Sequence, residues 1–100
     1  MAKWHLTNRA VSDLDSIWEY TANVWSEQQA DLYYGELIVE IGHIANNKFL
    51  VDREYSEVKK GLFCHHYRKH LIFYKKEDNG DLLVIRILHE RMDVLPKLID

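Results

Sequence analysis

The sequence is poor in cysteine and has no long uncharged apolar run. Its single cysteine, Cys64, has no partner within the chain, so we expect no internal disulfide and a reducing compartment such as the cytoplasm. Apolar runs such as residues 82–85 have the length of a strand and fall far short of the roughly 20 residues that cross a bilayer. The opening Met-Ala-Lys-Trp-His lacks the apolar segment of a signal peptide. We therefore expect a cytoplasmic protein.

Glycine and proline are also scarce. The four glycines are scattered, which excludes a glycine-rich phosphate loop, and the single proline excludes a proline-rich linker. With 100 residues, of which 47% are hydrophobic, the chain has the size and apolar content of one folded domain rather than of a disordered segment. We expect residues 1–100 to form a single domain.

Charge is nearly balanced overall but uneven along the chain. The net charge is −3, and residues 1–50 hold three Lys or Arg against seven Asp or Glu. Residues 59–76 hold six bases and no acid. This pattern disfavours nonspecific coating of nucleic acid and favours a specific acidic partner.

The first half of the chain has the apolar spacing of two helices. Residues 3–6 alternate like a short strand, and Thr7 can cap a helix whose apolar stripe runs from Ala10 to Trp25. Ser26 and Gln29 form a capping box, so a second helix follows at once and its stripe ends near Asn46-Asn47. We expect an antiparallel helical hairpin. Its stripe aromatics are expected in the core: Trp18, Trp25, Tyr33 and Tyr34.

The second half changes to a period of two. Residues 62–68, 70–76 and 82–89 read as strands, and Asn79-Gly80 marks a hairpin turn between the last two. Residues 92–99 read as a short terminal helix. The predicted fold is α+β: an N-terminal strand, a helical hairpin packed on a three- to four-stranded antiparallel sheet, and a short C-terminal helix.

The facing of the last strand suggests a docking surface. Strict alternation turns Leu83, Ile85 and Ile87 toward the helices. It leaves Arg86 on the opposite face with an apolar set of Leu82, Val84 and Leu88. An uncovered apolar face usually awaits a partner, so we expect that face to be a binding surface.

The residues offer three candidates for chemistry: a metal site, a reactive thiol, and acid–base catalysis on RNA. His66, His70 and His89 could converge across adjacent strands, but no acid or cysteine stands at ligand spacing, so no metal site is predicted. Cys64 lies between apolar and histidine residues and is expected to be a buried structural thiol. General acid–base work on RNA would need histidine or tyrosine beside a basic phosphate cradle. The available side chains are His65, Tyr67, Arg68, His70, Arg86, His89 and Arg91.

Four segments, in order, resemble one toxin family. They are Ala10-x-x-Asp13-Leu14-x-x-Ile17-x-x-Tyr20; then Trp25, Ala30 and Tyr33; then His70-Leu71-Ile72-Phe73-Tyr74; and finally Arg86-Ile87-Leu88-His89-Glu90-Arg91-Met92-Asp93. Together they resemble the ParE branch of the RelE/ParE toxins over nearly the whole chain. The resemblance implies a type II toxin–antitoxin toxin, a helical hairpin on an antiparallel sheet, and inhibition of DNA gyrase without catalysis or cofactor. It also implies a cognate antitoxin, typically a ribbon-helix-helix DNA-binding protein.

From this resemblance we expect a target-binding set at the end of the last strand: Arg86, His89, Arg91 and Met92. An acidic antitoxin tail is expected over the basic band at Lys59, Lys60, Arg68, Lys69 and Lys75. The first alternative is a RelE-type ribosome-dependent endoribonuclease with His89 or His70 as acid or base and with Arg68, Arg86 and Arg91 on phosphate. The second is an inactive member that only binds its antitoxin.

Overall fold

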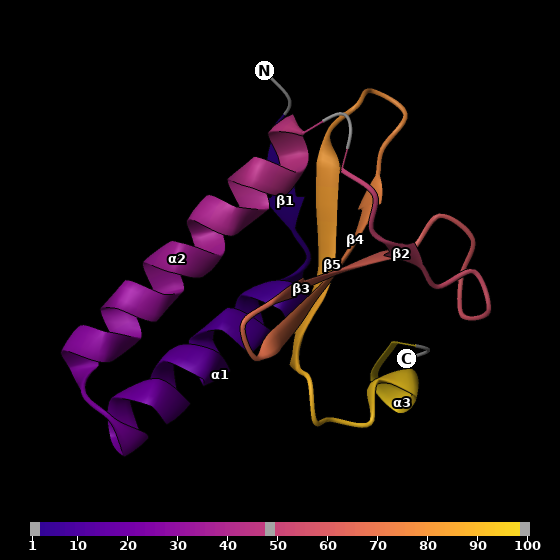
Figure 1. Cartoon of the computed structure of the whole chain (residues 1–100). Coiled ribbons are helices and arrows are strands. Elements are labelled where there is room, and N and C mark those ends of the chain that lie inside the picture. Colours follow the sequence, from indigo (N-terminus) through magenta and orange to yellow (C-terminus); the bar gives the residue numbers. More distant parts are fainter. Residues whose placement is uncertain (1–2, 48–49, 99–100) are drawn as a thin grey trace.

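The computed structural model describes residues 3–47 and 50–98. A helical hairpin lies on one face of a twisted sheet, and a loop and a short helix lie on the other (Figure 1). The strands are β1 (Trp4–Leu6), β2 (Arg53–Glu54), β3 (Phe63–Tyr67), β4 (His70–Lys76) and β5 (Leu82–His89). The helices are α1 (Asn8–Val24), α2 (Glu27–Asn46) and α3 (Val94–Leu98).

Both long helices begin at the caps that the sequence predicts. The Thr7 hydroxyl accepts the Ala10 N–H at 3.1 Å and donates to the Ile85 carbonyl at 2.7 Å, so the same side chain starts α1 and fixes it to β5. The Ser26 hydroxyl accepts the Gln29 N–H at 3.0 Å. With only Trp25 and Ser26 between the helices, α1 and α2 must run antiparallel.

The sheet has five strands in the order β1-β5-β4-β3-β2, one more than the expected maximum of four. β1 runs parallel to β5, and every other pair is antiparallel, so the sheet is mixed rather than purely antiparallel. The additional strand, β2, is two residues long, which is too short for a period of two to be visible in the sequence. In the described residues no helix is long and apolar enough to cross a membrane.

The predicted facing of β5 is wrong for Leu82, Val84 and Ile85 and correct for Ile87 and Leu88, because the strand contains a bulge between these two groups. Phe73 pairs with Arg86 and Tyr74 with Val84, so Ile85 is an extra residue without a partner on β4. One extra residue reverses the alternation. Leu82, Val84 and Ile87 therefore join the core beneath the helices, whereas Ile85 and Leu88 pack on the opposite face. Of the expected helix-facing residues, only Ile87 is in that core.

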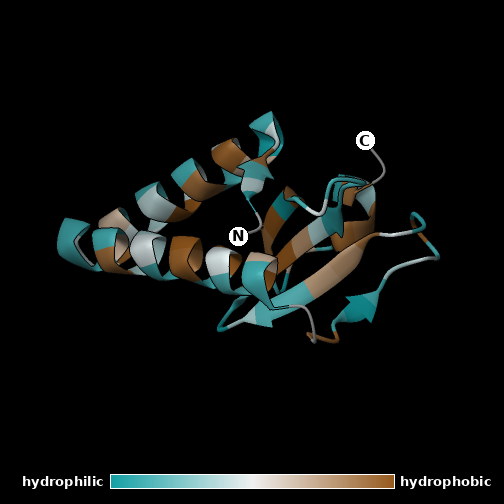
Figure 2. Ribbon diagram, turned by 90° about the horizontal axis from the view of Figure 1, so that it is seen from above, coloured by the Kyte–Doolittle hydropathy of each residue, from teal (hydrophilic) through white to brown (hydrophobic). Residues whose placement is uncertain are grey.

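The opposite face is apolar, as expected, but it is not open. Leu62, Cys64, Phe73 and Leu88 form a second buried cluster there. It is covered by the loop after β2 and by α3, whose contacting side chains include Tyr55, Val58, Val94 and Leu98. In the view from above, the apolar centre of the sheet lies between the helical layer and these covering segments (Figure 2). A docking role for this face would require these segments to move.

Two of the four expected core aromatics are exposed. The tip of the helical hairpin projects beyond the strands (Figure 1), so the stripe there has no sheet to cover it. Trp25 at the tip is 74% exposed and Tyr34 is 37% exposed. Tyr33 packs against the helix-side core, and Trp18 is partly buried.

Candidate partner-binding surface

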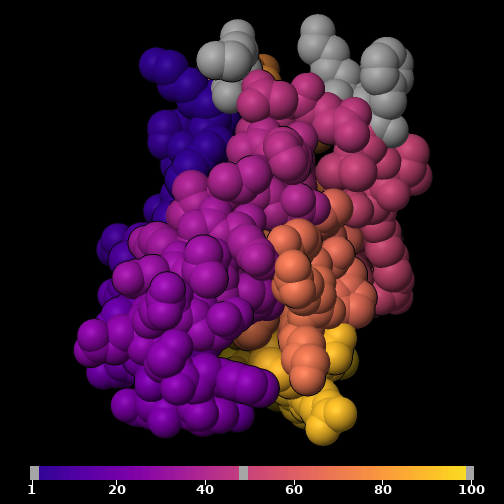
Figure 3. Space-filling view, turned by 60° about the vertical axis from the view of Figure 1, so that its left-hand side comes forward, coloured from indigo at the N-terminus to yellow at the C-terminus, as the bar shows by residue number. Residues whose placement is uncertain are grey.

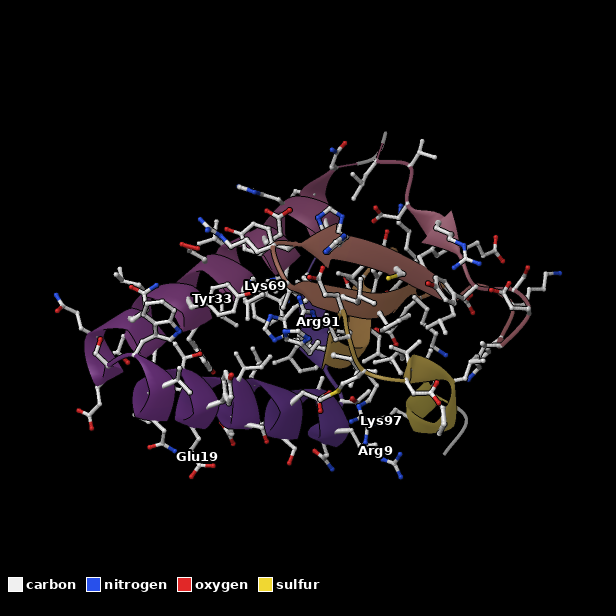
Figure 4. The ribbon with its side chains drawn as sticks, turned by 60° about the horizontal axis from the view of Figure 1, so that its bottom comes forward. Arg9, Glu19, Tyr33, Lys69, Arg91 and Lys97 are labelled. Atoms are coloured by element: carbon white, nitrogen blue, oxygen red, sulfur yellow. The ribbon has the colours of Figure 1, made fainter. Side chains whose placement is uncertain are left out.

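The end of β5 brings together segments that are far apart in the sequence. In the space-filling view, the turn between β3 and β4, the C-terminal segment and the helical hairpin meet at one end of the molecule (Figure 3). The Glu90 N–H donates to the Lys69 carbonyl at 2.9 Å, which joins the turn to the segment after β5. Figure 4 shows Lys69 and Arg91 there, with Tyr33 of α2 beside them.

Arg86 is held inside the fold. Its Nε donates to Asp13 Oδ2 at 2.8 Å and its Nη2 donates to Asp13 Oδ1 at 2.9 Å. A third bond runs from Nη1 to the Lys97 carbonyl at 3.1 Å. The two charged side chains are only 14% and 13% exposed. Arg86 therefore ties β5 to α1 and α3, and little of it faces a partner; its predicted role in target binding stays a prediction.

Asp13 also completes the backbone of β5. β1 pairs with β5 only at Leu82, Leu83 and Val84, so beyond that point β5 lacks a neighbouring strand on this side. The Ile87 N–H donates to Asp13 Oδ2 at 3.0 Å in place of a strand partner. Asp13 therefore supplies the acceptor that the missing strand would have supplied. The sequence motif that contains Asp13 gives no sign of this contact with β5.

His70 and His89 lie at the end of the sheet under α2. Burial, followed by the neighbouring His89, lowers the pKa of His70 to about 4. Burial raises the pKa of Tyr33 to about 12, and its hydroxyl is hydrogen-bonded to His70 Nδ1 at 2.6 Å. The two imidazole rings meet edge to face with centroids 5.3 Å apart. His70 is thus a neutral, anchored side chain.

His89 shapes the turn that follows β5. Its Nδ1 accepts the Arg91 N–H at 3.1 Å, and its carbonyl accepts the Met92 N–H at 3.0 Å. The turn leaves Arg91 exposed and Met92 47% exposed. A hollow of about 370 Å³ adjoins them. It is lined by Arg86, Met92, Asp93, Pro96 and Lys97. His89 therefore positions the two residues of the predicted target set that face solvent.

The predicted basic band is divided among three places. Arg68 and Lys69 form the turn between β3 and β4, whereas Lys75 lies near the other end of β4, roughly 20 Å along the strand at about 3.3 Å per residue. Lys59 and Lys60 are exposed on the loop that covers the second cluster. A segment without acidic residues therefore does not form one continuous cationic surface in this fold.

Arg68 is the member of the band with an acidic partner. Its Nε lies 3.1 Å from Glu36 Oε1 of α2 and 3.4 Å from the Tyr67 hydroxyl. The hydrogen bond to Tyr67 and the charge of Glu36 raise the pKa of Arg68. Its backbone has a φ of 52°, a left-handed conformation that suits the tight turn. In the described chain no salt bridge involves Lys59, Lys60, Lys69 or Lys75.

A second polar cluster was not foreseen. His65 Nε2 lies 2.6 Å from Glu40 Oε2, and His65 Nδ1 lies 3.0 Å from Asp52 Oδ1. The Tyr74 hydroxyl donates to Asp52 Oδ2 at 2.6 Å; burial, with the Asp52 contact second, raises the pKa of Tyr74. These bonds join α2, β3, β4 and the connector before β2, so their role is to hold the connector in place. Sequence spacing gives no sign of them because the partners are 13 to 25 residues apart.

Cys64 and the histidines were the candidates for thiol and metal chemistry. Cys64 is a buried thiol, as expected, and burial raises its pKa to about 11. Within the described residues, no group of three His, Cys, Asp or Glu side chains could hold a metal ion.

Comparisons with known proteins agree on one family. The family model described as the ParE toxin of the type II toxin–antitoxin system parDE matches residues 5–94. Toxin ParE1 of Mycobacterium tuberculosis is 34% identical over 98 residues, which cover 93% of this chain and 94% of that protein. Toxin ParE of Escherichia coli is 31% identical over 100 residues, covering 100% of this chain and 96% of that protein.

A solved structure has the same fold. A chain of the chromosomal ParDE TA system from P. aeruginosa superimposes with a TM-score of 0.74 at 15% sequence identity, and the match covers 89% of this chain and 96% of that one. The identity is low enough that this likeness supports the fold alone. The family match and the curated relatives carry the assignment: the chain belongs to the ParE toxin family of type II toxin–antitoxin systems.

Proposed function

We propose that this ParE-family toxin inhibits DNA gyrase by binding it, in the cytoplasm, through the turn after β5. The observation that carries the proposal is the exposure of Arg91 and Met92 side by side on a turn that His89 holds in shape. Cationic and apolar side chains that project together from a fixed turn suit protein recognition. Arg86 supports this turn from within through its bond to the Lys97 carbonyl.

The same geometry favours binding over RNA cleavage. A RelE-type reaction would use His70 or His89 as acid or base and arginines on the phosphate. His70 is neutral with a pKa of about 4 and is hydrogen-bonded to the Tyr33 hydroxyl, while Arg86 and Arg68 each have a carboxylate partner. Rearranging all of these contacts would be needed to assemble a phosphate cradle.

The test is a supercoiling assay with purified gyrase and relaxed plasmid. The native chain should inhibit supercoiling, and Arg91→Ala combined with Met92→Ala should weaken inhibition at least about tenfold, as expected for the loss of two contact residues. A matched control removes one cation and one apolar side chain elsewhere, with Lys76→Ala and Val51→Ala, and should inhibit normally. No inhibition by the native chain at excess toxin would refute the proposal.

The antitoxin is the second proposed partner. We assign to it the cations Lys59, Lys60, Arg68, Lys69 and Lys75, and we expect a ribbon-helix-helix protein with an acidic tail. Lys69 and Lys75 lie near opposite ends of β4, so a tail that contacts both must extend over at least roughly 20 Å, about six residues in extended form, and must continue onto the loop after β2 to meet Lys59 and Lys60. The Lys69 end also adjoins Arg91, so a bound tail would cover part of the proposed gyrase-binding turn. Neutralisation then follows from steric overlap.

Binding of the protein encoded beside this gene tests the antitoxin proposal. Affinity should fall as salt rises, and Lys69→Ala should weaken binding more than Lys76→Ala, which removes the same charge outside the set. The toxin expressed alone should arrest growth, and co-expression should restore it. Normal growth without the antitoxin would instead indicate an inactive member that only binds its antitoxin.

A further inference from the structure

The outer side of the helical hairpin carries a groove that the proposed function does not use. The hollow measures about 560 Å³ and lies between α1 and α2. Its lining combines two aromatic side chains, Trp18 and Tyr34, with three carboxylates, Asp15, Glu19 and Asp31. Figure 4 shows Glu19 on the outer side of α1, away from Lys69 and Arg91. The groove is therefore a separate surface from the turn after β5.

A hydrogen bond orients one of the two aromatic side chains. The Trp18 indole N–H donates to Asp31 Oδ1 at 2.9 Å, which links α1 to α2 across the groove. Tyr34, on α2, also lines the groove and is 37% exposed. Aromatic side chains and carboxylates that line one groove match the two features of a planar cation, namely its flat surface and its charge.

The charge of the groove is uncompensated. Residues 8–46 hold seven acids and one arginine. The acids that face the sheet have cationic or histidine partners: Asp13 meets Arg86, Glu36 meets Arg68 and Glu40 meets His65. In the described residues, by contrast, none of the three groove carboxylates forms a salt bridge. The three carboxylates are thus available to a cationic group of a partner.

We propose that this groove binds an arginine side chain presented by a basic segment of a protein partner. The guanidinium stacks on Trp18 or Tyr34 while its N–H groups donate to the groove carboxylates. A phosphodiester backbone or an acidic tail is repelled by the same carboxylates, so the occupant differs in charge from the acidic segment assigned to the Lys69 end. Arginine is favoured over lysine because its planar head both stacks and donates in a fork.

Nuclear magnetic resonance of the Trp18 indole N–H tests this directly. The probes are three capped tripeptides, Ala-X-Ala, in which X is arginine, lysine or citrulline, the neutral isostere of arginine. The arginine tripeptide should shift the Trp18 resonance in a saturable manner and bind at least about fivefold more tightly than the citrulline tripeptide, in keeping with the strength of a cation–aromatic contact. The lysine tripeptide should fall between them.

Matched variants separate the groove from general charge. Glu19→Gln and Asp15→Asn should each weaken the arginine tripeptide several-fold, and Tyr34→Leu should weaken it while keeping the apolar volume. Glu27→Gln removes an equal charge from an exposed position of α2 outside the groove and should bind normally. Circular dichroism of each variant establishes that it is folded.

Three results would overturn the proposal. Equal shifts with arginine and citrulline would show that the charge does not matter, and equal affinity for lysine would remove the assignment to arginine. Weakening by Glu27→Gln to the same degree as by Glu19→Gln would reduce the effect to net charge. None of these measurements involves gyrase, so the outcome is independent of the proposed function.

Discussion

The ion pair between Asp13 and Arg86 should be the largest single polar contribution to stability in this domain. Asp13→Ala removes two charge-assisted bonds to the guanidinium and the acceptor of the Ile87 N–H. Arg86, whose side chain is 14% exposed, then has lost its carboxylate. Of the bonds described above, it keeps the one to the Lys97 carbonyl. Breaking a buried pair on one side costs about 3–5 kcal/mol, and the small residual exposure places this case near about 3 kcal/mol.

Urea unfolding followed by tryptophan fluorescence measures the cost. A loss of about 3 kcal/mol lowers the melting temperature of a domain of this size by at least about 12 °C. Arg86→Met should cost less, because Asp13 then keeps the Ile87 N–H as a donor. The double variant should be more stable than the sum of the two single costs predicts, with a coupling of about 2 kcal/mol. A cost below about 1 kcal/mol for Asp13→Ala, or additive costs, would refute the assignment.

Three further outcomes follow from burial and from the bulge. Ellman's reagent at pH 8 should label Cys64 at least about 100-fold more slowly in the folded chain than in urea, because burial raises the thiol pKa to about 11; similar rates would contradict this. Since the pKa of His70 falls from 6.5 to about 4, the unfolded chain alone takes up this proton between those values. Stability should therefore decrease as pH drops through that window, and His70→Gln should flatten the slope in an acid-unfolding series. Val84→Asp should cost about 4 kcal/mol or more and Leu83→Asp about 1–2, since Val84 is 0% exposed beneath the helices; the reverse order would contradict the bulge.

Local signals in the sequence predict most of the helical layer. Thr7 and Ser26 cap the helices that they were expected to cap, and the apolar stripe places Leu14 and Leu37 in the core. These predictions succeed because each depends on residues within one or two turns of each other. The prediction of a buried Trp25 is wrong, because the helix sequence does not show where the sheet beneath it ends.

The facing of β5 shows why the sheet was harder to predict. Residues 82–88 are apolar except for Arg86, so the run fits either phase of a period of two. A single unpaired residue, Ile85, then exchanges the faces of its neighbours. Nothing within the strand identifies the bulge, because it arises from pairing with β4 and from the Thr7 contact to the Ile85 carbonyl.

The number of charged residues is evident from the sequence, but their arrangement in the fold is not. Lys69 and Lys75 are six residues apart in the sequence and lie near opposite ends of β4 in the fold, and Lys59 and Lys60 lie on a separate loop, so the acid-free stretch produces three cationic places rather than one. The acids of the hairpin divide in the same way. Asp13 on α1 and Glu36 on α2 face the sheet and pair with arginines there, whereas Asp15 and Glu19, both on α1, form no salt bridge within the described residues. Because a helix turns about 100° per residue, neighbouring acids serve different surfaces, one holding the fold together and the other available to a partner.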